Sequence, residues 1–215
     1  MSTLPCSEDL ILNGAAIKHV SDFKYLGSMM ASSENDIRKR RALAWAAFWK
    51  LQKIWKAQAV PRVLKLKIFQ TTCLPVLLYG CETWVITKSL SQYLDSYLTN
   101  CLRIILGIKR LDRVPNSELY RLTQLRPVTQ TIQEKQLRWI GHILRKALDE
   151  PINIYALYQP THGHRRRGRQ RLLYPEYIAG LINDEVTLSP PEIRKMAQDR
   201  IGWSKLVSDC SAADR

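Results

Sequence analysis

The feature that most constrains the fold of this chain is a long basic stretch with helical spacing and no acidic side chain. It runs from Ile37 to Cys81, between Asp36 and Glu82, in a chain whose formal net charge is +14. Like charges repel one another in a compact state unless a counter-charge approaches. We therefore expect a polyanionic partner, and a phosphate backbone is the first candidate. The positive side chains of the stretch are Arg38, Lys39, Arg40, Arg41, Lys50, Lys53, Lys56, Arg62, Lys65 and Lys67.

The first half of this stretch has the pattern of an amphipathic helix. Ser33 followed by Asp36 is typical of a helix N-cap and a first-turn acid, and we expect the helix to continue to about Ala59. At about 100° per residue, one face is apolar and the opposite face is basic. The apolar face contains Ile37, Ala44, Phe48, Leu51 and Trp55. The basic face contains Arg38, Arg41, Lys53 and Lys56, with Trp45 and Trp49 on the same side.

The basic face has two interpretations. Cations neutralise phosphates while aromatic rings stack on bases or sugars, so the combination suits nucleic acid. Alternatively, Trp45 and Trp49 pack on a neighbouring helix and the cations form a solvated face. A second helix, with Pro61 at its first position, adds Arg62 and Lys65 to the predicted nucleic-acid contacts.

The segment before residue 30 is predicted to be β. Asn13-Gly14 lies between two apolar runs and indicates a hairpin, and Phe23 to Gly27 is expected to form a third short strand. Three short strands are too few to make a stable sheet of their own. We therefore expect a small three-stranded edge of something larger.

The remainder is predicted to be mainly helical. We expect Pro75 to break or kink the second helix and Gly107 to end the third. The composition changes after Glu150, which indicates a basic C-terminal appendage. Helices are predicted over Ser89–Leu106, Ser117–Thr123, Thr129–Lys146, Glu176–Asp184 and Pro190–Arg200, with an extended segment over Ile152–Gln159 and a frayed tail from Ile201. The fold class is thus mainly α, with divisions at residues 1–30 (β), 31–150 (helical) and 151–215 (basic).

Composition narrows the class of partner and the compartment. The pI of about 9.8 favours nucleic acid first and an anionic membrane surface second. No run of about 20 apolar residues is present, so no membrane span is expected. The five cysteines are scattered and show no C-x-x-C spacing, which favours reduced thiols in an intracellular protein of the nucleus or cytoplasm.

The sequence contains no recognisable catalytic site. It has no phosphate-binding glycine loop with Lys-Ser/Thr, no H-E-x-x-H and no G-x-S-x-G. A two-metal nucleotidyl-transfer site needs clustered carboxylates, and none is visible. His142, His162 and His164 are candidate metal ligands, but the arginines beside the last two disfavour a cation. We predict no catalytic residue, no cofactor and no metal.

An arginine-rich run near residue 165 is the second basic feature. Arginine offers planar, bidentate contacts to phosphate, and Gly168 within the run permits close approach of the backbone. The same run is equally compatible with a nuclear import signal or with a solvated loop. The arginines that we assign to nucleic-acid binding are Arg165, Arg166, Arg167, Arg169 and Arg171.

Several stretches together resemble one family. Phe23-Lys24-Tyr25-Leu26-Gly27-Ser28 resembles the FKYLG motif near the end of the palm in non-LTR (LINE-type) retrotransposon reverse transcriptases. Further matches follow in the order of that family and cover nearly the whole chain. They are LLYGCETW at Leu77–Trp84, LRIILGI at Leu102–Ile108, DRV with Asn at Asp112–Asn116, RWIGHILR at Arg138–Arg145 and RRGR at Arg166–Arg169.

The resemblance implies a part of a polymerase. In that family the FKYLG segment belongs to the primer grip, so Phe23, Lys24, Tyr25, Leu26 and Gly27 are expected to contact the 3′ end of a growing strand. The helices that follow would form the thumb, which tracks the template–primer duplex. The Ala-Asp-Asp motif that carries catalysis lies upstream in the family and is absent here. The family often has Trp after the Gly-Arg motif, where this chain has Leu172-Leu173-Tyr174.

Three functions follow as hypotheses. The first is a polymerase fragment that is inactive alone and binds an RNA/DNA hybrid or duplex DNA. The rest of a polymerase is its candidate protein partner. The second is a small nucleic-acid-binding protein reused from such an element. The third is a protein-interaction module that uses exposed tryptophan faces.

Overall fold

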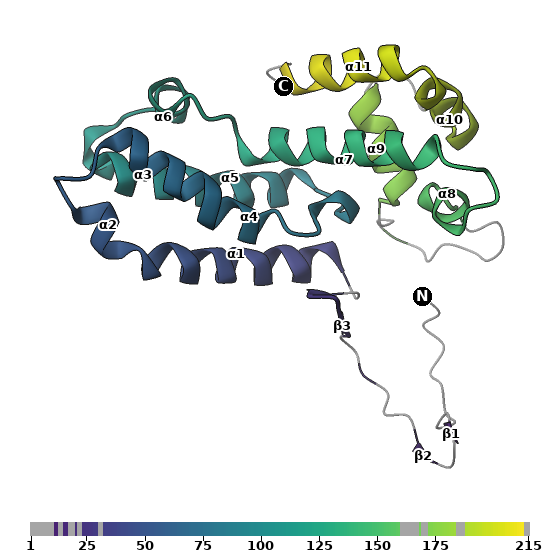
Figure 1. The fold of residues 1–215 in the computed structure, drawn as a ribbon, viewed down its shortest axis with the longest axis horizontal. Helices are drawn as coiled ribbons and strands as arrows, with labels where there is room; N and C mark the ends of the chain where they lie inside the picture. The colour runs from purple at the N-terminus through teal and green to yellow at the C-terminus, as the bar shows by residue number, and fades with distance from the viewer. Residues whose placement is uncertain are drawn as a thin grey trace.

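The computed structural model describes residues 11–12, 15–16, 20, 23–29, 32–159, 168, 172–183 and 188–212. As expected, the described chain is mainly α-helical (Figure 1). Its strands are β1 (Ile11–Leu12), β2 (Ala15–Ala16), β3 (Lys24–Tyr25) and β4 (Ser28–Met29). Its helical elements are α1 (Ser33–Lys50), α2 (Gln52–Lys56), α3 (Arg62–Ile68), the π-helical turn η1 (Phe69–Cys73), α4 (Leu74–Leu77), the 3₁₀ turn η2 (Cys81–Thr83), α5 (Lys88–Leu106), the 3₁₀ turn η3 (Arg110–Asp112), α6 (Asn116–Thr123), α7 (Val128–Leu144), α8 (Pro151–Ala156), α9 (Tyr174–Ile182), α10 (Pro190–Gln198) and α11 (Arg200–Ala212).

The helices form layers around α5 and α7. Helix α1 packs against α4 and α5, and α5 packs against α7. On the other side of α7 lie α10 and α11, so α7 joins the two parts of the molecule (Figure 1). One cluster of buried apolar side chains extends from Ile37 in α1 to Val207 in α11. Each fully buried large side chain of this kind contributes about 1.5–3 kcal/mol to folding.

Aromatic rings form the part of the core beneath α1. Phe48 stacks on Trp55 with ring centroids 5.0 Å apart and meets Phe69 edge-on at 6.1 Å. Tyr97 of α5 donates its hydroxyl hydrogen to the carbonyl of Ala44 across 3.2 Å. The predicted apolar face of the first helix is therefore confirmed at its centre, where Ala44 and Phe48 are completely buried.

The first helix is shorter than predicted. It ends at Lys50, not near Ala59, and Leu51 separates it from the short α2. The indole of Trp55 donates to the carbonyl of Phe48 across 2.7 Å, which occupies an acceptor at the end of α1 and stabilises the bend. At the other end the N-cap is Ser32, whose Oγ accepts from the backbone of Asn35, and not Ser33.

The β segment also differs from its prediction. Strand β1 pairs with β2, as expected for a hairpin around residues 13–14. The stretch from Phe23 to Gly27 is not one strand of a three-stranded edge, because β3 pairs with β4 in a separate two-stranded sheet. Leu26 and Gly27 form the turn with φ values of 46° and 91°. Glycine adopts such angles readily, and a two-residue turn therefore interrupts the apparent strand.

Pro75 does not end the second helix. The chain passes through the π-helical turn η1 and continues as α4, with Pro75 near the start of α4. Thr72 donates its hydroxyl to the carbonyl of Ile68 across 2.6 Å, and Thr71 donates to that of Lys67 across 2.9 Å. These side-chain bonds occupy carbonyls at the end of α3, where the regular α-helix gives way to the wider π-helical turn.

The described residues of the last third contain more helix than the sequence predicts. The predicted helices near residues 176–184 and 190–200 are confirmed as α9 and α10, within two residues at each end. The extended segment predicted from Ile152 is wrong, because Pro151 begins α8. The frayed tail predicted from Ile201 is also wrong: α11 buries Trp203 against α7, where the indole donates to the carbonyl of Leu137 across 2.8 Å. Within the part of the chain that is described, no helix is long and apolar enough to cross a bilayer.

Candidate nucleic-acid interface

Exposed cations gather where the chain turns from α1 through α2 into α3, at one end of the molecule (Figure 1). Among the described residues, none of these cations takes part in an ion pair. No acidic residue lies between Asp36 and Glu82 in the sequence. The surface therefore has an uncompensated positive charge. We call it the basic corner and define it as Lys50, Lys53, Lys56, Arg62 and Lys67.

Two tryptophans adjoin the basic corner and differ in exposure. Trp45 is half-buried and meets the ring of Tyr97 edge-on at 4.9 Å. Trp49 is 48% exposed and stacks on Trp45, with centroids 6.0 Å apart and planes 16° apart. Both interpretations of the pair thus apply in part. Trp45 packs on a neighbouring helix, whereas Trp49 presents a rigid aromatic surface to solvent beside Lys50.

Arg38 and Arg41, also predicted contacts, are already engaged within the protein. Arg38 pairs with Glu34 at 2.8 Å, and hydrogen bonding to that carboxylate raises the pKa of Arg38 above its usual value. The guanidinium of Arg41 lies 3.8 Å from the centroid of the Tyr93 ring. Both guanidinium groups lie near the ring of Tyr93 on α5, and they are less free to meet a phosphate than the lysines of the basic corner.

Lys65, which was predicted to contact nucleic acid, is not exposed. Its side chain is buried, with only 7% of the residue exposed, and Nζ donates to the carbonyl of Trp55 across 2.8 Å. That carbonyl lies in the last turn of α2, where backbone acceptors lack intrahelical partners. Lys65 therefore closes the end of α2 and does not belong to the exposed surface.

The β3–β4 hairpin, which contains the primer-grip-like residues, lies on the first half of α1. The exposed fractions of Phe23, Tyr25 and Leu26 are 58%, 56% and 75%, and Lys24 is also exposed. The hairpin is attached through its backbone. Tyr79 donates its hydroxyl to the carbonyl of Leu26 across 2.8 Å.

Asp36 connects the hairpin to the segment Cys81–Trp84. One carboxylate oxygen accepts from the backbone of Met29 at 3.0 Å, and the other accepts from the Trp84 indole at 2.9 Å. Asp36 is buried, so these bonds satisfy a carboxylate that burial would otherwise penalise. Two stretches that resembled the same family, at residues 23–28 and 77–84, thus meet at the start of α1.

Gln136 holds the same segment from the opposite side. Its amide nitrogen donates to the carbonyl of Cys81 at 2.9 Å and to that of Trp84 at 2.8 Å. Its amide oxygen accepts from the hydroxyl of Tyr177 at 2.9 Å. The stretch at residues 138–145 lies on the same helix, α7, and its Gly141 lies against the indole of Trp203.

The arginine-rich run lies outside the described residues. Its predicted contacts therefore receive no structural description, and the assignment to nucleic acid stays a prediction. These residues are Arg165, Arg166, Arg167, Arg169 and Arg171.

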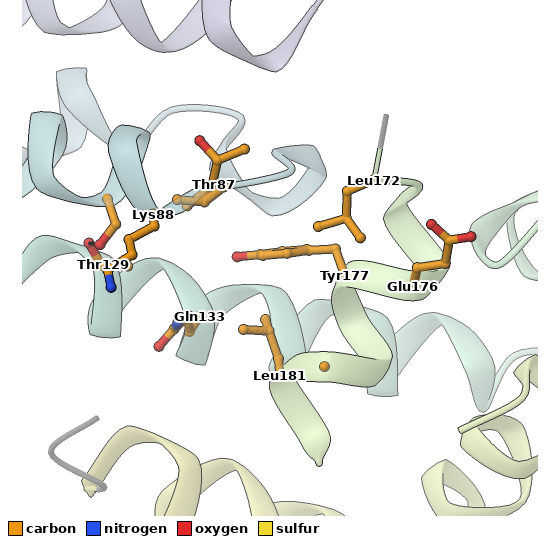
Figure 2. A pocket seen from close by; sticks show the side chains of 11 residues that line it. Thr87, Lys88, Thr129, Gln133, Leu172, Glu176, Tyr177 and Leu181 are labelled. Atoms are coloured by element: carbon orange, nitrogen blue, oxygen red, sulfur yellow. Dashed lines mark hydrogen bonds between the residues drawn. The ribbon is translucent and has the colours of Figure 1, made fainter. Parts of the chain in front are cut away.

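A pocket of about 380 Å³ lies between the start of α5, α7 and α9. Figure 2 shows the ring of Tyr177 reaching from α9 toward the side of the pocket formed by Thr129 and Gln133. Two of its polar groups are bonded within the protein: Tyr177 donates to Gln136, and the hydroxyl of Thr129 donates to Asp95 at 2.8 Å.

The buried thiols are also poorly reactive. Cys73, Cys81 and Cys101 are buried, and burial raises the pKa of Cys81 to about 12. A thiol with such a pKa is protonated at neutral pH and is a poor nucleophile. The basic corner can therefore attract an anion by its charge, and the described thiols include no activated nucleophile.

Comparison with known proteins gives one distant similarity. An uncharacterized transposon-derived protein of Caenorhabditis elegans is 24% identical over 200 residues, which span 87% of this chain and 70% of the relative. No family model matches the chain, and no solved structure matches it.

Proposed function

We propose that this chain derives from a transposable element and corresponds to the primer-grip and thumb region of a non-LTR retrotransposon reverse transcriptase. It binds the backbone of a template–primer hybrid or of duplex DNA and does not add nucleotides by itself. The similarity to a transposon-derived protein supports the origin. The contact between the two resembling stretches at the start of α1 is consistent with one inherited unit.

The observation that supports nucleic-acid binding most strongly is the basic corner. Its five cations are exposed and lack acidic partners among the described residues. Phosphate contacts of this kind position a protein on nucleic acid without reading its sequence. Trp49 adds a ring that can stack on a base or a sugar. The exposed residues from Phe23 to Leu26, together with the half-buried Gly27, form the second part of the proposed interface.

Charge reversal tests the proposal. A triple variant with Lys50→Glu, Lys53→Glu and Lys56→Glu removes three of the predicted phosphate contacts. At 0.1 M salt the loss of counterion release for three contacts weakens binding by roughly 10²–10³-fold. Affinity is measured by fluorescence anisotropy with a labelled 20-bp DNA duplex and with an RNA/DNA hybrid of the same sequence.

A matched control reverses three exposed cations on the far side of α7. Lys195→Glu, Arg200→Glu and Lys205→Glu change the net charge by the same amount, but these residues lie on α10 and α11. We expect this control to change the affinity by less than about tenfold, since the separation screens most of its effect. Equal losses in both variants would show that net charge alone, and not the basic corner, causes binding.

The exposure of Trp49 also favours a second candidate, a surface for a protein partner. Aromatic residues are enriched at such interfaces. In that case Trp49→Ala would abolish partner capture, while the triple charge reversal would leave capture nearly unchanged. Template-directed nucleotide addition by the purified chain would contradict the proposed absence of catalysis.

A further inference from the structure

Arg40 is an unusual cation in this molecule because it is buried. Only 8% of the residue is exposed. One terminal nitrogen, Nη2, donates to the carbonyl of Gly27 at 2.7 Å, and the guanidinium lies 4.2 Å from the centroid of the Tyr79 ring. Arg40 is thus enclosed between the turn of the β3–β4 hairpin and the turn that precedes η2.

The positive charge of Arg40 lacks an anion. Among the described residues, no carboxylate forms an ion pair with it, and its Nε is buried without a hydrogen-bond partner. Asp36 lies one turn earlier on α1, but its oxygens accept from Met29 and Trp84. A carbonyl and an aromatic face offset only part of the cost of burying a charge.

Lys39, the neighbouring residue, reaches the same hairpin. It is half-buried, and its Nζ lies 3.3 Å from the sulfur of Met29. A thioether is a weak acceptor and carries no charge. Two consecutive cations of α1 therefore contact one hairpin, at Gly27 and Met29, and neither has an acidic partner among the described residues.

We propose that Lys39 and Arg40 form a binding site for a phosphate group beneath the β3–β4 hairpin. The planar guanidinium suits the oxygens of a phosphate, which would supply the missing negative charge and an acceptor for the Nε–H of Arg40. Gly27 keeps its carbonyl on Arg40 through a positive φ that other residues adopt reluctantly. The phosphate belongs either to a nucleic-acid backbone, which rests on the proposed function, or to free inorganic phosphate.

Thermal unfolding of the full chain tests the site directly. A ligand that binds only the folded state stabilises it increasingly as the ligand concentration exceeds Kd. We expect inorganic phosphate to raise the Tm of the wild type above that in sodium chloride of equal ionic strength. The variant Arg40→Met should lose this phosphate-specific rise.

Arg103→Met provides the matched control. Arg103 also donates to a backbone carbonyl, that of Val114, at 2.8 Å, but it has a further acceptor in the side chain of Asn116 at 3.0 Å. This variant should keep the phosphate-specific rise in Tm. It also controls for any general effect of salt on stability. An equal rise in all three proteins would overturn the proposal.

A second measurement covers the case in which Arg40→Met does not fold. Isothermal titration of wild type with inorganic phosphate should detect a site that Lys39→Met weakens, and the absence of binding to wild type would contradict the proposal.

If the phosphate belongs to a nucleic-acid backbone, Arg40→Met should weaken duplex binding by about tenfold. The slope of log affinity against log salt concentration should then become less steep by about 0.9. Phosphate binding with unchanged duplex affinity would assign the site to free phosphate.

The result also separates this inference from the proposed function. The triple variant at Lys50, Lys53 and Lys56 should keep the phosphate-specific rise in Tm, because those residues lie at least ten positions along α1 and α2 from Arg40. Failure of nucleic-acid binding in every assay would therefore leave the phosphate measurement intact.

Discussion

Replacing Gln136 by leucine tests how the segment Cys81–Trp84 is held in place. Gln136 is completely buried, and all of its described bonds go to groups at the same junction. It donates to the carbonyls of Cys81 and Trp84 and accepts from the hydroxyl of Tyr177. Leucine has a similar size, so the main effect is the loss of hydrogen bonds and not a cavity.

The magnitude follows from the groups left without partners. Each buried polar group that loses its partner costs about 1–3 kcal/mol. Two carbonyls and one hydroxyl are affected, and partial relaxation makes the effects less than additive. We expect the free energy of unfolding to fall by about 3–5 kcal/mol, a large part of the 5–15 kcal/mol typical of folded proteins. For a chain of 215 residues this corresponds to a Tm lower by roughly 6–20 °C.

Urea unfolding followed by circular dichroism measures the difference. The comparison variant Tyr177→Phe removes one of the same bonds and should cost about 1–2 kcal/mol. The double variant should cost less than the sum of the single variants, because the bond between the two side chains is lost only once. A loss below about 1 kcal/mol for Gln136→Leu would refute the reasoning, since the carbonyls would then be satisfied in another way.

Three further predictions concern a helix contact, a buried thiol and an ion pair. Gly141→Ala places a methyl group on the indole of α11 and should destabilise the protein by about 1–3 kcal/mol in urea unfolding, whereas Gly180→Ala, with open space around it, should stabilise it by about 0.5–1 kcal/mol. Burial raises the pKa of Cys81 to about 12, so iodoacetamide at pH 8 should leave it unmodified in the folded protein and alkylate it in urea, as read by peptide mass spectrometry. The hydrogen-bonded guanidinium of Arg126 holds the pKa of Glu134 below its usual 4.5, so this pair stabilises the protein above that pH and the contribution is lost as the pH falls through the lowered value. Glu134→Gln should cost about 0.5–1 kcal/mol at pH 7, and the difference from wild type should shrink as the pH falls below 4.5 and through the lowered pKa.

The long helices were predictable from hydrophobic periodicity, because apolar side chains recur at helical spacing along many residues. In α5 the apolar positions recur at helical spacing until Gly107, whose φ of 72° ends the helix as expected. The end of α1 was not predictable in this way. It depends on the bond from Trp55 to Phe48, which favours a bend within a segment whose pattern continues as a helix.

Contacts between distant residues explain the other differences. Helix α11 has little amphipathic pattern, and it is held because Gly141 admits Trp203 against α7. Nothing in the sequence indicates that Gly141 and Trp203 lie in contact. The sequence predicts a strand through Gly27, where the chain turns, because alternation alone cannot distinguish a short strand from a tight hairpin.

The sequence predicted a basic candidate interface, but it did not predict which of its cations are exposed and which are buried. The acid-free stretch correctly indicated an exposed basic surface, because nothing in it can neutralise Lys50, Lys53 or Lys56 locally. Lys65 looks the same in sequence, and only the carbonyl of Trp55 distinguishes it. Arg40 likewise resembles its neighbours until Gly27 and Tyr79 enclose it.

The salt dependence of duplex binding tests the central claim most directly. If the five cations of the basic corner each neutralise one phosphate, log affinity should fall against log salt concentration with a slope of about −4.5. The triple charge reversal should reduce the slope to about −1.8, since two contacts would remain. A wild-type slope shallower than about −1 would contradict phosphate binding by this surface.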